Sequence, residues 1–149
     1  MWKLENIGYT KKYNMSSYLT FYLVPKAEDS KPLDLISYSR NNNVYNYFNE
    51  NLNPAYIGIK EIQYTELNIS KIDLVLDDIN SDINSINNRL LEYEKHANGN
   101  IEIIEEILNQ KEYLKEVINA KNIVEFIKSL ILESTYSWSN YNKVLCNIS

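Results

Sequence analysis

The side chains able to act as a nucleophile or a general base are few and lie far apart in the sequence. The chain holds one cysteine, Cys146, and one histidine, His96. A nucleophilic cysteine needs a positioned base, and no motif links these two residues. A single histidine also excludes multi-histidine zinc sites, and no motif context supports a Ser–His–Asp arrangement. We therefore expect His96 to lie at a helix end and Cys146 to be an unreactive thiol.

Carboxylates recur at helical intervals in two parts of the chain. The first group is Asp73, Asp77, Asp78 and Asp82, and the second is Glu102, Glu105, Glu106 and Glu112. Carboxylates spaced in this way can bind a cation or transfer protons, but adjacent ones point away from each other on a helix. The three glycines are isolated, so no phosphate-binding glycine loop is present. We expect a solvated acidic helix face, no metal or other cofactor, and no enzymatic activity.

The charge distribution favours a basic protein partner over nucleic acid. The formal net charge is −5, and residues 71–133 hold thirteen acidic but only seven basic side chains. Nucleic-acid binding needs basic groups that neutralise phosphates, so we expect no direct contact with nucleic acid. An acidic surface complements a basic groove on another protein. Glu102, Glu105 and Glu106 are the predicted contacts.

Tyrosine is the most informative excess in the composition. Nine of the thirteen tyrosines fall within the first 64 residues. Tyr18 with Tyr22, and Tyr56 with Tyr64, are predicted to project to one side of their strands. Such tyrosines form a recognition face for a protein, or line a pocket for a small nucleotide-like ligand. Packing of the sheet against helices explains them equally well, and both interpretations stay open.

Strand patterns dominate the first 66 residues. Apolar residues alternate in 17–24, 33–39 and 55–65, and residues 2–9 are a further candidate strand. Residues 44–51 suit one or two helical turns. No helix long enough for a parallel crossover lies between the first strands. The sequence therefore predicts a three- or four-stranded antiparallel sheet.

The apolar pattern changes to a heptad repeat at residue 69. The predicted seam has spacings of three and four and consists of Ile69, Ile72, Leu76, Ile79, Ile83, Ile86, Leu90 and Tyr93. Ser70 is the candidate N-cap of a helix over 71–95. A second helix over 101–133 has a broader stripe that Gln110, Lys121 and Lys128 interrupt. The short break between the helices predicts an antiparallel hairpin.

The remaining predictions concern assembly and the tail. The less regular seam of the second helix leaves apolar surface around Val117, Ile118 and Val124, which predicts a homo-oligomer. The aromatic tail, residues 134–149, is expected to return to the sheet as a last strand, with a helix as the alternative. The chain is predicted to be one α+β domain of residues 1–149, made of a sheet region (1–66), a helical hairpin (69–133) and this tail.

The function expected from these features is that of a non-enzymatic binding protein that inhibits or modulates a target macromolecule. No segment resembles a signal peptide or membrane span, and one cysteine suits a reducing compartment, so we expect a cytoplasmic protein. The abundance of Asn, Ile, Lys and Tyr is typical of AT-rich genomes. It suggests a phage or mobile-element accessory protein that acts against a host defence system. The alternatives are a small-ligand sequestering protein with a tyrosine-lined pocket and a structural coiled-coil assembly module.

Overall fold

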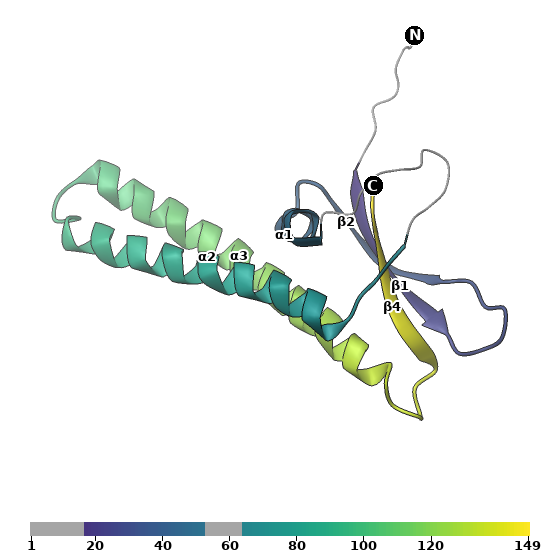
Figure 1. Ribbon diagram of the computed structural model, residues 1–149. Helices are drawn as coiled ribbons and strands as arrows, with labels where there is room; N and C mark the ends of the chain where they lie inside the picture. The colour runs from purple at the N-terminus through teal and green to yellow at the C-terminus, as the bar shows by residue number, and fades with distance from the viewer. Residues whose placement is uncertain (1–16, 53–63) are drawn as a thin grey trace, which may run out of the picture.

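The computed structural model describes residues 17–52 and 64–149 and confirms the predicted α+β fold. An antiparallel sheet precedes a long helical hairpin, and a C-terminal strand returns to the sheet (Figure 1). The elements in chain order are β1 (Tyr18–Pro25), β2 (Leu33–Ser39), α1 (Asn43–Leu52), β3 (Thr65–Glu66), α2 (Ile69–Lys95), α3 (Ile101–Glu133) and β4 (Tyr141–Ile148).

The strand order in the sheet is β2-β1-β4-β3, and every neighbouring pair is antiparallel. The C-terminal strand β4 thus lies between the two strands β1 and β3, where it pairs with both. Within the predicted strand 55–65, only its last residues are described, and β3 is two residues long. The candidate strand over residues 2–9 lies outside the described residues.

The sheet has one buried face because apolar residues alternate in the two central strands. Leu19 and Phe21 of β1 and Cys146 and Ile148 of β4 are almost fully buried. These residues stand opposite each other in the ladder, with Phe21 beside Cys146 and Leu19 beside Ile148. The alternate residues of β1, beginning with Tyr18, therefore point to the other face of the sheet.

The helical hairpin forms through the predicted seam. Ile72, Ile79 and Ile86 of α2 are at most 1% exposed. The helix begins earlier than predicted: its N-cap is Asn68, whose Oδ1 accepts a hydrogen bond from the Lys71 backbone N–H at 2.9 Å, and Ser70 lies inside the first turn. Gly99, at a φ of 76°, turns the chain between α2 and α3.

Two of the polar residues that seemed to interrupt the second seam have partners on α2. Lys128 Nζ donates to Asp73 Oδ1 at 2.8 Å, and Arg89 Nε donates to Gln110 Oε1 at 3.3 Å. The two contacts lie at opposite ends of the helix pair. They accompany the apolar seam and are consistent with the antiparallel alignment of α2 and α3.

Helix α1 joins the sheet to the hairpin. The Phe48 ring meets the Phe21 ring edge to face, with centroids 5.1 Å apart. On its other side, the Tyr47 hydroxyl donates to Asp82 Oδ2 at 2.6 Å, and Asn51 Nδ2 donates to Asp78 Oδ2 at 2.8 Å. Two of the acidic residues of α2 therefore hold α1 in place. Of the helices in the described ranges, none combines the length and apolar character needed to cross a membrane.

Candidate functional site

Three of the four predicted recognition tyrosines lie on the outer face of the sheet, opposite the buried face. Tyr18 is 45% exposed and Tyr64 is 42% exposed, while Tyr22 is half-buried. The rings of Tyr22 and Tyr64 pack edge to face with centroids 5.0 Å apart. The prediction that Tyr56 shares this face with Tyr64 concerns a residue outside the described ranges. The outer face of the sheet thus carries aromatic side chains, as the interpretation of the tyrosines as a recognition face requires.

Polar side chains surround these tyrosines on the same face. Thr20 and Ser37 share a hydrogen bond of 2.8 Å between their hydroxyl oxygens, and Lys143 Nζ lies 3.7 Å from Glu66 Oε1. Burial is the main cause that raises the pKa of Tyr22 above its usual value of 10.0. Tyr22 is therefore a neutral donor and acceptor at physiological pH.

The predicted acidic contacts lie at the end of the hairpin that is farthest from the sheet (Figure 1). We call residues 91–108 the hairpin tip. Glu102 and Glu105 are exposed, and neither forms an ion pair within residues 17–52 and 64–149. Glu106 is half-buried, and its Oε1 accepts a hydrogen bond from Gln110 Nε2 at 3.2 Å. Two of the three predicted carboxylates are thus free to meet a partner.

Exposed apolar side chains lie among these carboxylates. Ile101, Ile104 and Leu108 are 71%, 43% and 61% exposed, and their spacing of three and four places them on one side of α3. Leu91 of α2 is 60% exposed. The hairpin tip holds five acidic side chains and one lysine, Lys95. The sequence predicted the charge of this surface but not its exposed apolar residues, because Ile104 and Leu108 have the same spacing as residues that pack between helices.

The predicted oligomer interface is divided between core and surface. Val117 and Val124 are fully buried, so they offer no free apolar surface to a second copy, whereas Ile118 is 41% exposed. Helix α3 contacts α1 and β4 as well as α2, and Val117 and Val124 belong to the buried core. The burial of these two residues is thus explained by packing within the chain.

The aromatic tail divides into a loop and a strand. Tyr136 and Trp138 lie in the loop before β4, and their rings stack with centroids 5.3 Å apart. Lys26 Nζ donates to the backbone oxygens of Tyr136 and Ser137, which fixes this loop beside the end of β1. The predicted return of the tail to the sheet is confirmed, but the strand begins only at Tyr141, so Tyr136 and Trp138 lie outside it.

The residues considered for catalysis do not come together. Cys146 is buried in the sheet, and burial raises the pKa of its thiol to about 12. His96 is the C-cap of α2, and its Nε2 lies 3.3 Å from Glu92 Oε2 at the exposed hairpin tip. Among the side chains that the structure describes, no group of three histidine, cysteine, aspartate or glutamate residues is arranged to hold a metal ion.

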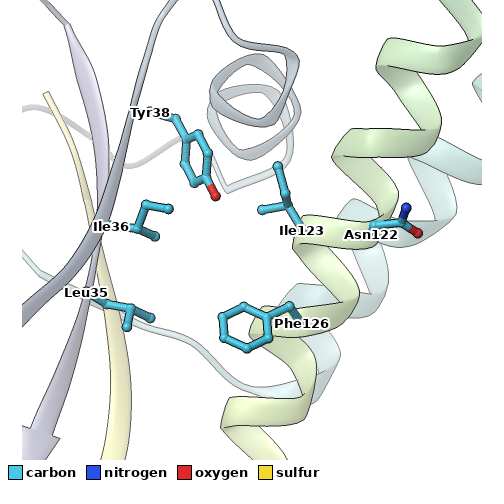
Figure 2. A pocket seen from close by; sticks show the side chains of 6 residues that line it. All are labelled: Leu35, Ile36, Tyr38, Asn122, Ile123 and Phe126. Carbon is cyan, nitrogen blue, oxygen red and sulfur yellow. The ribbon is translucent and has the colours of Figure 1, made fainter.

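A cleft that the sequence did not predict lies between the edge strand β2 and helix α3. It has a volume of about 300 Å³ and is lined by Leu35, Ile36, Tyr38, Asn122, Ile123 and Phe126. Figure 2 shows the side chains of β2 on one wall and those of α3 on the other. The residues that line this cleft are distant in sequence. Only the pairing of β2 with β1 and the packing of α3 bring them together.

Comparison of the chain with protein-family models, with curated proteins and with solved structures finds no match.

Proposed function

We propose that this chain is a non-enzymatic binding protein that holds a basic protein target at its hairpin tip. The observation that carries the proposal is the combination of exposed apolar and acidic side chains there. Ile101 and Leu108 are each more than 60% exposed, and five carboxylates lie within the same residues 91–108. Clustered exposed apolar side chains with a polar rim are typical of protein interaction sites.

The carboxylates favour a basic target. Removing Glu102 and Glu105 from water against a neutral surface costs free energy, since both lack a cationic partner within the described part of the chain. A lysine or arginine on the target offsets that cost and speeds association through long-range attraction. The apolar residues then supply the contact area that strengthens the complex once it has formed.

The same charge argues against direct nucleic-acid binding. Phosphates would approach five acidic side chains and one lysine at the hairpin tip, and the repulsion opposes the neutralisation that nucleic-acid affinity requires. An acidic projection instead suits a basic groove, including one that holds nucleic acid in the target's working state. Occupation of such a groove would inhibit the target.

The biological role we propose follows from this inhibition. A small acidic protein from an AT-rich genome, acting in the cytoplasm, suits a phage or mobile-element accessory protein that blocks a host defence protein. The support is composition together with the charge of the hairpin tip. We propose no catalytic role, and the buried thiol of Cys146 supports that view.

Affinity capture tests the proposal. The immobilised full chain is incubated with a nuclease-treated lysate of a low-GC bacterium, and retained proteins are identified by mass spectrometry. We expect a basic protein to be retained by the wild type and lost from a Glu102→Lys/Glu105→Lys variant. A Glu28→Lys/Glu50→Lys variant is the matched control, because it makes the same charge change at two other exposed positions. Equal retention by the wild type and the hairpin-tip variant would refute the proposal, as would a partner that is captured only from a parallel lysate without nuclease treatment.

A further inference from the structure

The cleft between β2 and α3 has the lining of a site for apolar side chains. Ile36 and Tyr38 of β2 face Ile123 and Phe126 of α3 across it (Figure 2), and no charged residue lines it. Phe126 is 54% exposed and Ile36 is 42% exposed. Apolar side chains from an occupant would remove both from water.

Strand β2 borders this cleft and lies at the edge of the sheet. Among the described residues, it hydrogen-bonds along one side only, to β1. The Arg40 N–H donates to the Ser17 backbone oxygen at 3.1 Å, so residue 40 faces β1. Because the direction of backbone groups alternates along an antiparallel strand, the N–H and C=O of Ser37 point away from β1. This edge therefore offers backbone donors and acceptors for another strand.

The Tyr38 hydroxyl supplies a polar group inside the cleft. It lies between Ile36 and Ile123 (Figure 2), and it forms no hydrogen bond with the side chains or backbone of residues 17–52 and 64–149. Burial raises the pKa of this phenol above 10.0, so it remains a donor at neutral pH. A backbone carbonyl of an occupant that lies beside the Tyr38 hydroxyl would accept a hydrogen bond from it.

We propose that β2 and α3 bind an extended, uncharged segment of a partner protein, which adds beside β2 as a further strand. Backbone hydrogen bonds to the edge at Ser37 provide affinity. Alternate side chains of the segment enter the cleft against Ile36 and Phe126 and provide selectivity for apolar residues. This inference concerns a different surface from the hairpin tip and does not depend on the function proposed for the tip.

A second copy of the chain fits this edge less well than a peptide segment. β2 has seven residues, so its edge is about 23 Å long at roughly 3.3 Å per residue. With a sheet thickness of about 10 Å, two paired edges would bury about 230 Å² per chain, against the roughly 800 Å² per partner of a stable interface. A peptide segment buries more area than this edge contact alone, because it is covered by β2 on one side and by α3 on another.

A displayed library of random peptides, each roughly ten residues long, tests the proposal without a known partner, since this length spans one strand. The library is selected on the full wild-type chain and counter-selected on Phe126→Lys. We expect enriched peptides to share two apolar residues at positions i and i+2. Binding of a synthetic enriched peptide should weaken at least about 10-fold in Phe126→Lys, because a charge then enters the apolar cleft. Circular dichroism checks that the variant, altered at an exposed position, keeps its fold.

Substitutions at Ser37 and Tyr38 separate strand addition from simple apolar contact. Ser37→Pro removes an N–H that points away from β1, which edge strands tolerate, and should weaken peptide binding at least about 10-fold. Ser37→Ala is the matched control and should change affinity less than about 2-fold, because it keeps the N–H. Tyr38→Phe should weaken binding about 2- to 12-fold, the range expected for one neutral hydrogen bond.

Four results would overturn the proposal. The first is the absence of any peptide enriched over the Phe126→Lys counter-selection. The second is unchanged affinity in Ser37→Pro. The third is a wild-type dimer in sedimentation that Ser37→Pro converts to a monomer, which would assign the edge to a second copy. The fourth is peptide binding only after removal of residues 1–16, which would assign the edge to the chain itself. None of these results bears on capture by the hairpin tip.

Discussion

Replacement of Tyr47 by phenylalanine removes one oxygen atom and tests how α1 is fastened to the helical hairpin. Tyr47 is 5% exposed, and its hydroxyl donates to Asp82 Oδ2 at 2.6 Å. Asp82 is half-buried and has no other hydrogen-bond partner in the described part of the chain. The substitution therefore leaves a partly buried carboxylate without its donor.

The expected loss follows from the charge of the acceptor. A hydrogen bond to a charged group contributes about 1.5–3 kcal/mol, so Tyr47→Phe should lower the free energy of unfolding by about 2 kcal/mol. For a chain of this length, that corresponds to a fall in Tm of about 4–8 °C. Tyr45→Phe is the matched control on the same helix, because its hydroxyl donates at 3.1 Å to an oxygen of Ser149, an exposed residue that water can reach once the hydroxyl is removed. It should cost only about 1 kcal/mol.

Urea unfolding followed by circular dichroism measures both variants. In an Asp82→Asn background the acceptor is neutral, so the same Tyr47→Phe change should cost about 1 kcal/mol rather than about 2. A loss in Tyr47→Phe no larger than that in Tyr45→Phe would refute the reasoning. An equal loss in the presence and absence of the Asp82 charge would refute it as well.

Three further predictions concern burial and titration. Val117→Asp should cost about 3–5 kcal/mol in urea unfolding, because it places an unpaired charge in the core, whereas Ile118→Asp should stay within about 0.5 kcal/mol; similar losses would contradict the assignment of core and surface. Burial and Glu133 raise the pKa of the Tyr141 phenol to about 12, so its contribution to stability is complete below pH 10.0 and is lost as the pH rises toward 12. Tyr141→Phe should therefore show a shallower alkaline loss of Tm than the wild type, and an unchanged slope would count against this cause. The Cys146 thiol, with a pKa of about 12, should react with a thiol reagent slowly in the folded chain and quickly in urea; fast reaction of the folded chain would show that it is not buried.

The helical hairpin was predictable because its signals are local. The spacing of three and four from Ile69 places one stripe on α2, and α3 spans the predicted residues 101–133. The sequence predicts Ser70 as the first N-cap, whereas the N-cap is Asn68, since both side chains suit this position and only the geometry distinguishes them. Strand β2 also has its predicted bounds, 33–39.

Features that depend on distant pairing were not predictable to the same extent. Gln110 and Lys128 seemed to interrupt the seam of α3 because their partners, Arg89 and Asp73, lie on the other helix. Val117 seemed available to a second copy because its cover comes from packing across the fold. The pairing of β4 with β1 joins segments that are more than 100 residues apart, which no local pattern specifies.

For the candidate surfaces too, local features were predictable from the sequence and features that depend on distant residues were not. The charge of the hairpin tip was predictable because Glu102 and Glu105 are near each other in sequence. The exposed apolar residues of the hairpin tip were not predictable, since Ile104 and Leu108 have the same spacing as residues that pack between helices. The cleft beside β2 depends on Ile36 and Phe126, which only the tertiary structure brings together.

The affinity of a captured protein partner, measured at low and at high salt, tests the binding role of the hairpin tip most directly. Glu102→Lys/Glu105→Lys should weaken the complex about 10-fold or more near 50 mM salt, and the difference should shrink to about 2-fold near 1 M, where charges are screened beyond about 3 Å. Glu28→Lys/Glu50→Lys should bind like the wild type under both conditions. Equal dissociation constants for the wild type and the hairpin-tip variant at low salt would contradict the account.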